Sequence, residues 1–374
     1  MKIAVVRETA PHERRVAATP ETVRKLRKLG ARVAIETGAG LSVHLSDAQY
    51  AEAGADIGGR AEVLDGAGLV LAVQGPAPEE LPAGAVLVGA LNPYWERPRI
   101  AAYAERGIEA LAMEFIPRRL SRAQSMDVLS SQANLAGYKA VIDAAEAYGR
   151  IFPLLMTAAG TVPAARVFVM GVGVAGLQAI ATARRLGAVV SATDVRPATR
   201  EEIVSAGGKP VFVEDEETAA AETEGGYARE MSDAYKAKQA ALISETIARQ
   251  DIVITTAQIP GRPAPRLVSA AQLATMRPGS VLVDLAVETG GNVEGSVAGE
   301  TVVTEGGVII IGHRNYPSRV AEAASALFSR NLANFVETFW DRESGVLGLR
   351  DGDEIIEAIR VTRGGRIVHP ALVA

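Results

Sequence analysis

The residues best suited to bind a ligand form one glycine-rich stretch, Gly171-Val172-Gly173-Val174-Ala175-Gly176. Its G-x-G-x-x-G spacing lies between an apolar, strand-like run (166–170) and a helix-like run (177–186). In this context the first glycine permits a tight turn, the second lets the backbone approach a pyrophosphate, and the third lets the helix pack against the strand. N–H groups at a helix start face such phosphates. The stretch therefore predicts a dinucleotide site that includes Gly171, Val172, Gly173, Val174 and Gly176.

An acidic residue farther along the chain indicates which dinucleotide is bound. Asp194 follows the strand-like run 188–193, eighteen residues after Gly176, and the usual spacing is about 20. A carboxylate there accepts hydrogen bonds from the ribose hydroxyls and repels a 2′-phosphate, whereas an arginine such as Arg196 can accommodate that phosphate. Because Asp194 lies nearer to the usual ribose position, the sequence favours NAD(H), with Val195 and Arg196 as further cofactor contacts.

Residues that could transfer a proton do not lie near this motif. The four histidines are His12, His44, His313 and His369, and none lies in the glycine-rich stretch or in a polar stretch at 114–130. A dehydrogenase that acts on a hydroxy or amino acid needs a general acid or base, whereas hydride exchange between two nicotinamides needs none. The sequence also lacks paired metal-ligand spacing, a G-x-S-x-G elbow and a P-loop, so no metal site is predicted.

Two further segments have the composition of surface or functional loops. The stretch 114–130 is polar and rich in arginine, and it separates ordered elements, so a functional loop is expected there. The acidic stretch from Glu214 to Tyr227 is a long insertion for a βα unit. Its residues by themselves indicate a solvated loop, but the pair Gly225-Gly226 before an aromatic residue leaves a mobile lid as an alternative.

Composition excludes several classes of protein. The chain has 374 residues, 48% of them hydrophobic, a net charge of −5 and no cysteine. It is therefore expected to be globular, with about two or three domains, and without disulfides, iron–sulfur clusters, thiolate zinc sites or a cysteine nucleophile. The acidic balance argues against nucleic acid as a partner. The N-terminus does not resemble a signal peptide, and no apolar run approaches the roughly 20 residues of a membrane span.

Hydrophobic periodicity predicts an α/β fold. Short β-branched runs alternate with amphipathic segments, which is the pattern of βαβ units around a parallel sheet. Strands are expected at 3–6, 31–36, 69–73, 85–91, 108–113, 166–170, 188–193, 210–213, 251–255, 280–285 and 308–311. Long helices are expected at about 131–148 and 318–339. The prediction is two Rossmann-like, doubly wound parallel-sheet domains joined by long helices: a discontinuous first domain (1–130 plus 320–374) and an NAD(H)-binding domain (131–319).

Segments spread over the whole chain together resemble one known family. They run from Met1 to the tail Gly364–Leu372 and comprise Ser121-Arg122-Ala123-Gln124-Ser125-Met126-Asp127, Ser130-Ser131-Gln132, Asn134-Leu135-Ala136-Gly137-Tyr138, Met156–Pro163, Gly171–Arg185, Gly225-Gly226-Tyr227-Ala228 and Asp284-Leu285-Ala286-Val287-Glu288. On these segments the sequence is identified as a member of the family of the NAD(H)-binding alpha subunit of proton-translocating NAD(P)⁺ transhydrogenase, specifically its domain I component. That family is related to alanine dehydrogenase.

The resemblance implies roles for residues that the motif analysis left unassigned. In the family a conserved Arg, Gln and Asp lie beside the nicotinamide, with a Ser near its carboxamide. The corresponding catalytic residues are Arg119, Gln124, Asp127 and Ser130. Arg118 is adjacent, so which arginine faces the nicotinamide stays open. The family's mobile loop corresponds to Gly225, Gly226 and Tyr227, and Gln258 stands at a cofactor position where relatives often carry Leu.

The resemblance also implies an activity and its partners. NADH bound by this chain would pass a hydride directly to NADP⁺ on an NADP(H)-binding beta subunit, and a membrane component would couple the exchange to proton translocation. Since the chain carries no transmembrane segment, the expected partners include a small membrane alpha subunit. A homodimer is expected, cytoplasmic and peripheral on the cytoplasmic face of the inner membrane.

Two alternatives remain at the level of sequence. Alanine dehydrogenase would carry a substrate lysine after the third strand of the first domain and a catalytic histidine after the fourth. Those positions read Val73-Gln74-Gly75-Pro76 and Val88-Gly89-Ala90-Leu91-Asn92, and neither group is present. A non-catalytic NAD sensor would bind nucleotide without transferring hydride to any partner, and the sequence does not distinguish it from the transhydrogenase component.

Overall fold

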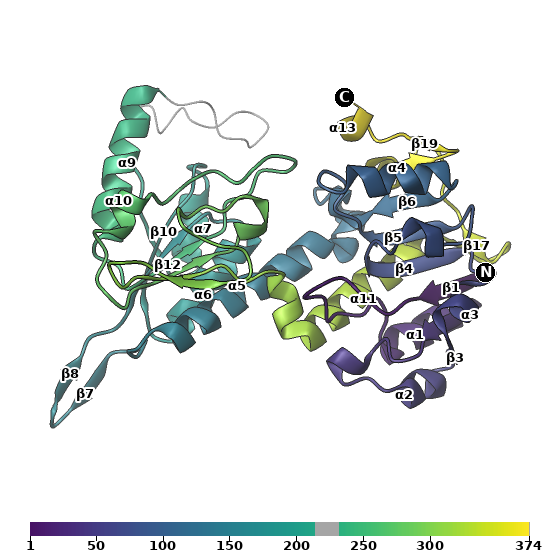
Figure 1. Ribbon diagram of the computed structural model, residues 1–374, viewed down its shortest axis with the longest axis horizontal. Coiled ribbons are helices and arrows are strands. Elements are labelled where there is room, and N and C mark those ends of the chain that lie inside the picture. Colours follow the sequence, from purple (N-terminus) through teal and green to yellow (C-terminus); the bar gives the residue numbers. More distant parts are fainter. Residues whose placement is uncertain (214–231, 374) are drawn as a thin grey trace. The chain divides into compact units, whose positions relative to one another are not determined.

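The computed structural model describes residues 1–213 and 232–373. The chain divides into two compact units (Figure 1): unit 1 is Met1–Gln132 with Pro317–Ala374, and unit 2 is Ala133–Tyr316. Unit 1 is therefore built from both ends of the chain, whereas unit 2 is one continuous segment.

Unit 1 contains a parallel sheet. Within the described residues this sheet has six strands in the order β3-β2-β1-β4-β5-β6, and every neighbouring pair is parallel. The order runs outward from β1 on one side and from β4 on the other, as in doubly wound Rossmann folds. The strands are β1 (Lys2–Val5), β2 (Arg32–Glu36), β3 (Asp56–Gly58), β4 (Leu69–Gln74), β5 (Val86–Ala90) and β6 (Glu109–Ala112).

The helices of unit 1 come from both ends of the chain. The α-helices are α1 (Pro20–Lys28), α2 (Asp47–Glu52), α3 (Arg60–Leu64), α4 (Arg97–Glu105), α11 (Ala321–Phe339), α12 (Glu354–Ile359) and α13 (Pro370–Val373). The 3₁₀ helices are η1 (Leu41–Val43), η2 (Pro78–Glu80), η3 (Met113–Phe115), η4 (Ser121–Met126) and η6 (Tyr316–Val320), which begins on the last residue of unit 2. Two short hairpins, β16 (Trp340–Asp341) with β17 (Val346–Leu347) and β18 (Thr362–Arg363) with β19 (Arg366–Ile367), complete the unit.

The C-terminal segment supplies part of the core of unit 1. Phe328, Leu332 and Phe335 of α11 are fully buried in the same hydrophobic cluster as Ile3 of β1 and Leu26 of α1. Burying such side chains is the main stabilising term in folding. Unit 1 therefore depends on residues more than 300 positions apart in the sequence.

Unit 2 contains the second sheet. Within the described residues it has seven strands in the order β11-β10-β9-β12-β13-β15-β14, all parallel except β14, which pairs antiparallel with β15. The strands are β9 (Arg166–Met170), β10 (Val189–Thr193), β11 (Lys209–Pro210), β12 (Ile252–Thr255), β13 (Val281–Asp284), β14 (Thr301–Val303) and β15 (Ile309–Ile311). The helices are the unit 2 portion of α5 (Val128–Ala147), then α6 (Val174–Arg185), α7 (Thr199–Ser205), α9 (Asp233–Ile247), α10 (Ala270–Leu273) and the 3₁₀ helix η5 (Val287–Thr289).

The predicted fold class, two Rossmann-like parallel-sheet domains, is confirmed, with local differences in short strands and in the start of one helix. The antiparallel edge strand β14, the short strand β3 and a hairpin of β7 (Leu155–Thr157) and β8 (Gly160–Val162) were not expected. Helix α5 begins three residues earlier than expected. The reason is its cap: Asp127, just before the helix, accepts a hydrogen bond from the backbone N–H of Ser130.

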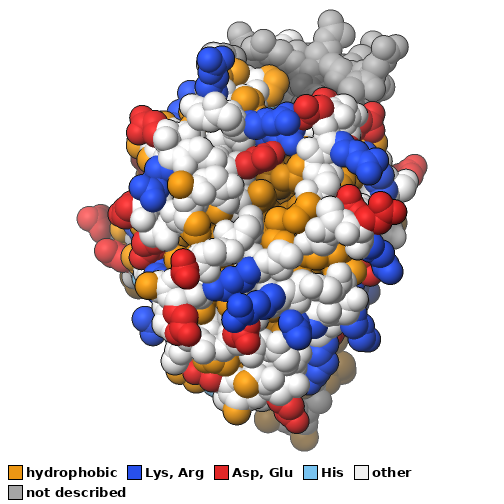
Figure 2. Space-filling view, turned by 90° about the vertical axis from the view of Figure 1, so that its right-hand side faces the viewer, with side chains coloured by type: hydrophobic (Ala, Val, Ile, Leu, Met, Phe, Trp, Pro, Cys, Tyr) orange, Lys and Arg blue, Asp and Glu red, His pale blue; other side chains and the backbone are white. Residues whose placement is uncertain are grey.

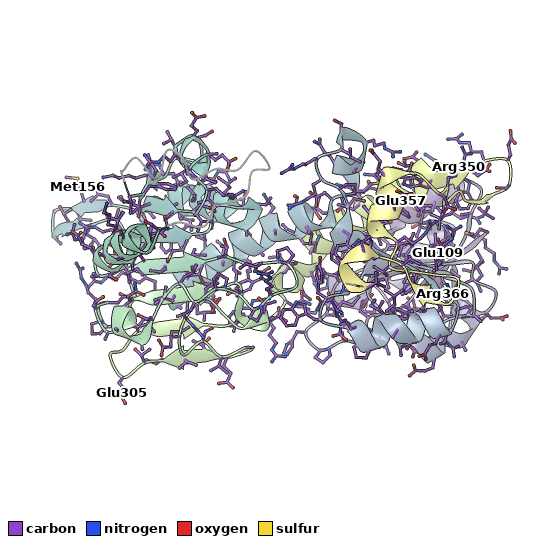
Figure 3. All side chains as sticks on the ribbon, turned by 90° about the horizontal axis from the view of Figure 1, so that it is seen from above. Glu109, Met156, Glu305, Arg350, Glu357 and Arg366 are labelled. Atoms are coloured by element: carbon purple, nitrogen blue, oxygen red, sulfur yellow. The ribbon has the colours of Figure 1, made fainter. Side chains whose placement is uncertain are left out.

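The proportion of charged and apolar side chains differs between parts of the surface. On the face drawn in Figure 2, basic and acidic side chains are interspersed around hydrophobic ones. The β7–β8 hairpin is apolar instead: Met156, labelled in Figure 3, is 75% exposed, and Leu154, Leu155 and Val162 are exposed as well. Among the helices described here, none combines the length and apolar character that crossing a bilayer requires.

Candidate functional site

The glycine-rich stretch forms the turn between β9 and α6 of unit 2. Gly171 has φ +100°, a conformation that other residues rarely adopt. A Cβ atom at Gly176 would lie 1.9 Å from the carbonyl oxygen of Gly171, so the helix and the turn are in direct contact. At Gly173, by contrast, a Cβ would meet nothing within 4 Å, and no side chain caps α6 there. The turn is thus closed on its inner side and open at the helix start, which fits a pyrophosphate.

Asp194 follows β10 and is hydrogen-bonded to this turn. Its carboxylate accepts from the backbone N–H of Val172 (2.7 Å) and from the backbone N–H of Arg196 (2.9 Å). The guanidinium of Arg196 donates to the same carboxylate (Nε to Oδ1, 3.0 Å) and to the carbonyl of Val172 (3.2 Å). The Asp194 side chain is 8% exposed and that of Arg196 39%, while Val195 between them is exposed. The structure thus brings the predicted acid and the competing arginine into one ion pair.

Residues after β12 form a further wall of this site. Thr256 donates its hydroxyl to the carbonyl of Gly171 (2.9 Å). The carboxamide of Asn292, which is fully buried, accepts from the N–H of Ala257 (3.1 Å) and donates to its carbonyl (2.9 Å). Gln258 donates to a backbone carbonyl of the loop after β13 (3.1 Å). Gln258 was expected at the site from the sequence, whereas Thr256 and Asn292 were not; the signal for Thr256 is its place directly after a strand paired with β9.

The polar loop of unit 1 runs through η4 into α5. Asp127 accepts from the backbone N–H (2.9 Å) and from the hydroxyl (2.5 Å) of Ser130, so both predicted residues belong to the cap of α5. Ala123 and Met126 are fully buried, whereas Gln124 between them is exposed. The loop therefore has a buried side that fixes its backbone and an outer side that carries Gln124.

The remaining predicted residues are less well defined. Arg118 and Arg119 are both exposed, so their burial does not indicate which of them faces the nicotinamide. Gly226 and Tyr227 lie outside the described residues. In the part of the chain that the structure describes, no three His, Cys, Asp or Glu side chains are grouped so as to hold a metal ion.

A separate polar cluster lies in unit 1 where β1 and β4 end. Glu8 accepts from the backbone N–H groups of Val73 (2.6 Å) and Gln74 (3.2 Å), and burial raises its pKa to about 8. Glu13 forms an ion pair with Arg15 (2.6 Å) and accepts from the side chain of Gln74 (2.8 Å). Gln74 lies in the segment where the resemblance to alanine dehydrogenase would require a substrate lysine. Its amide is instead part of a hydrogen-bonded network.

A doubly wound sheet with an open glycine turn at a helix start, and an acid after the second strand, defines unit 2 as a Rossmann-type dinucleotide-binding domain. Together with unit 1, this makes the protein a two-domain α/β dinucleotide-binding protein. The chain belongs to the alanine dehydrogenase/PNT family: the model of the N-terminal domain matches residues 4–136 and that of the C-terminal domain matches residues 140–370.

Known proteins are similar to this chain over its full length. It is 51% identical to the first part of the NAD(P) transhydrogenase alpha subunit of Rhodospirillum rubrum, covering 100% of this chain and 99% of the relative. The crystal structure of a transhydrogenase from Sinorhizobium meliloti is 51% identical, covers 98% of this chain and 100% of that chain, and has a TM-score of 0.89. A structure of L-alanine dehydrogenase is 26% identical, covers 100% and 98%, and has a TM-score of 0.81. The chain is thus a homologue of the transhydrogenase alpha subunit, and the family predicted from the sequence is confirmed.

Proposed function

We propose that this protein is the NAD(H)-binding component of a proton-translocating transhydrogenase. It exchanges a hydride directly between NADH in unit 2 and NADP⁺ on a partner beta subunit, and a membrane component couples the exchange to proton translocation. The observation that carries the proposal is the open turn at Gly173 beside the buried carboxylate of Asp194, in a chain that matches the first part of a transhydrogenase alpha subunit from end to end. NADH supplies the hydride; the protein supplies binding and orientation.

The roles proposed for unit 2 follow from its hydrogen-bonding groups. The backbone N–H groups at the start of α6, beside Gly173, hold the pyrophosphate. Asp194 accepts from the adenosine ribose hydroxyls, which take the place of Arg196 N–H donors that now occupy its carboxylate. Arg196 holds the Asp194 carboxylate in place through their ion pair. Gln258 and, by resemblance, Gly226 and Tyr227 contribute further contacts.

The roles proposed for unit 1 concern the nicotinamide end. Gln124, exposed on a fixed backbone, orients the nicotinamide or its ribose. Asp127 and Ser130 fix the direction of the loop and of α5, and the family resemblance assigns Ser130 to the carboxamide. Arg119 is the fourth residue that we assign to the nicotinamide end. None of these groups needs to transfer a proton, because hydride exchange between two nicotinamides releases none.

The proposed assembly includes partners that the chain does not contain. The relative from Rhodospirillum rubrum is by its name only the first part of subunit alpha, which supports a further, small membrane alpha subunit in addition to the NADP(H)-binding beta subunit. We propose a homodimer that acts at the cytoplasmic face of the inner membrane.

The test is reconstitution with a separately prepared NADP(H)-binding transhydrogenase component. Reduction of an NAD⁺ analogue by NADPH, followed by absorbance, is expected only when both proteins are present. L-Alanine with NAD⁺ is the matched control, and no oxidation above background is expected. Robust turnover of L-alanine would favour the alanine dehydrogenase alternative, whereas NADH binding without hydride transfer would favour the sensor.

A further inference from the structure

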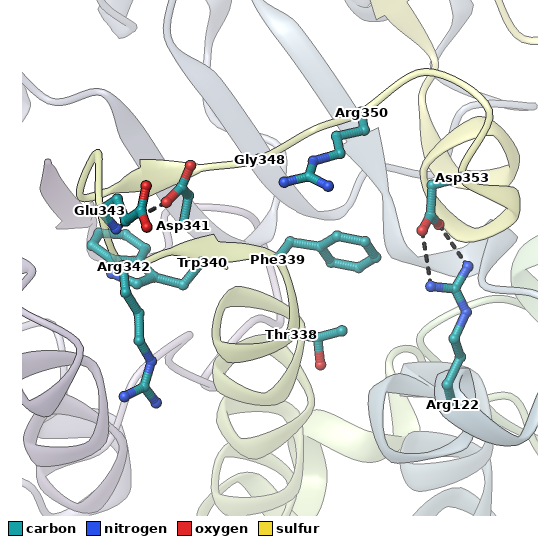
Figure 4. A pocket seen from close by; sticks show the side chains of 10 residues that line it. All are labelled: Arg122, Thr338, Phe339, Trp340, Asp341, Arg342, Glu343, Gly348, Arg350 and Asp353. Carbon is teal, nitrogen blue, oxygen red and sulfur yellow. Dashed lines mark hydrogen bonds and ion pairs between the residues drawn. The ribbon is translucent and has the colours of Figure 1, made fainter.

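The loop that carries Gln124 is connected to the C-terminal portion of unit 1. The backbone carbonyl of Ser125 accepts hydrogen bonds from the side chains of Asn331 (2.8 Å) and Asn334 (3.0 Å), both on α11. Arg122 donates through both terminal nitrogens to both carboxylate oxygens of Asp353 (2.8 and 2.9 Å), as Figure 4 shows. The residues on either side of Gln124 are therefore held by groups more than 200 positions later in the sequence.

Asn331 differs from the other connecting residues in burial and in the use of its amide. It is 9% exposed, whereas Asn334 and Arg122 are less buried. Its Nδ2 donates to Ser125, and its Oδ1 accepts from the hydroxyl of Ser131 on α5 (2.8 Å). One carboxamide thus links the loop, helix α11 and helix α5. A buried polar side chain with both ends paired fixes the groups it joins, because leaving either end unpaired costs free energy.

We infer that Asn331 is a positioning residue for hydride transfer. It holds the Ser125 carbonyl, so that the exposed side chain of Gln124 is presented in one orientation, and the Arg122–Asp353 pair supports the same loop. The inference rests on the proposed function and deepens it. Since Asn331 is buried and its amide is already paired on both sides, it acts through the loop and does not touch the nucleotide.

The expected effect falls on rate and not on binding. Hydride transfer requires the reacting carbons to be held near contact, and a misplacement of about 1 Å can slow such a step by about a hundredfold. Adenosine and pyrophosphate contacts belong to unit 2, which does not contain this loop. Loosening the loop should therefore slow the transfer step while leaving NADH affinity nearly unchanged.

The experiment compares substitutions on α11 in the reconstituted system. Asn331→Asp keeps the size and the acceptor for Ser131 but places an oxygen against the Ser125 carbonyl; Asn331→Leu removes both hydrogen bonds. The control is Ser329→Ala on the same helix, since Ser329 is buried and its hydroxyl donates within that helix, to the carbonyl of Ala326 (3.2 Å). Both Asn331 variants should lower the single-turnover rate at least about tenfold with the NADH Kd within about twofold, and Ser329→Ala should change neither.

A variant outside α11 keeps the test informative if the Asn331 variants do not fold. Asp353→Asn retains an N-cap for α12, because asparagine caps as well as aspartate, but removes the charge that pairs with Arg122. It should lower the transfer rate by a smaller factor, about threefold, again without a change in NADH Kd. Unchanged rates in the Asn331 variants, or a rise in Kd that matches the loss of rate, would overturn the inference.

Hydrogen exchange separates this inference from the proposed function. The amides of Ala123 and Asp127 donate within the loop (2.9 and 3.3 Å), so their exchange reports its order. Asn331→Asp should accelerate their exchange at least about tenfold and leave the amides of β9 unchanged. If the unmodified protein transfers no hydride, the proposed function fails, and the exchange data still decide whether Asn331 holds the loop. Unchanged exchange would overturn its positioning role.

Discussion

Replacing Asp194 by asparagine tests how the site distinguishes NADH from NADPH. The Asp194 carboxylate is almost buried, accepts from the N–H of Val172 and forms an ion pair with Arg196. A 2′-phosphate bound at this carboxylate would meet its negative charge. Asparagine has the same shape and can still accept from Val172, but its NH2 group then faces the N–H donors of Arg196, so the substitution removes both the charge and the pairing with Arg196.

The size of the effect follows from the distances. Two like charges about 4 Å apart repel by about 4 kcal/mol at an effective dielectric constant of about 20. The guanidinium of Arg196, 3.0 Å from the carboxylate, offsets part of this repulsion. We therefore expect a net preference for NADH of about 1 to 3 kcal/mol in the unmodified protein, equivalent to about 5- to 150-fold in Kd. In Asp194→Asn the preference should fall by about that factor, because Arg196 can then pair with the phosphate.

The assay is titration of NADH and of NADPH, followed by their fluorescence, in both proteins at the same salt concentration. The ratio of the two Kd values cancels any general damage to the site. Arg196→Leu is the matched variant: it removes the compensating cation and should widen the preference for NADH. A ratio that stays within twofold of the original in Asp194→Asn would refute the reasoning, as would equal affinities in the unmodified protein.

Three further predictions concern other regions of the molecule. Gln124→Asn should leave the NADH Kd within a few-fold and slow single-turnover hydride transfer by roughly a hundredfold, about 2.7 kcal/mol of barrier; an unchanged rate would remove Gln124 from the site. Gly176→Ala should lower the thermal midpoint by several degrees, because its Cβ would overlap the neighbouring turn, whereas Gly173→Ala should keep the midpoint and weaken NADH binding about tenfold, because its Cβ would enter open space; calorimetry and titration of both variants check the contrast. Burial raises the pKa of Glu8 from 4.5 to about 8, so between these pH values folded unit 1 binds a proton that the unfolded chain does not, and its stability should fall as pH rises, by at most about 1.4 kcal/mol per pH unit. Urea unfolding at pH 6 and pH 8 should show this loss in the unmodified protein and less of it in Glu8→Gln; equal losses in both would contradict it.

Most of the fold and of the glycine-rich site could be predicted from local sequence patterns. The glycine-rich stretch, its flanking strand and helix, and Asp194 are close in sequence, so their spacing reflects their geometry directly. The edge strand Thr301–Val303 was missed because its three residues are too few to show a period, and its direction depends on the strand it pairs with. The contact of Asn331 with Ser125 joins residues 206 positions apart, and no local pattern encodes such a pairing.

The discontinuity of unit 1 also determines the order in which the protein can fold during its synthesis. Residues 1–132 leave the ribosome before unit 2, yet their core is closed by Phe328, Phe335 and Ile359. At about 5 to 20 residues per second, the intervening chain takes about 10 to 45 s to make. Unit 2, being continuous, can fold within that interval, while the first sheet must wait with apolar surface exposed. The segment that precedes unit 2 in the chain is thus completed after unit 2, and nascent-chain binding by chaperones is expected to concentrate on it.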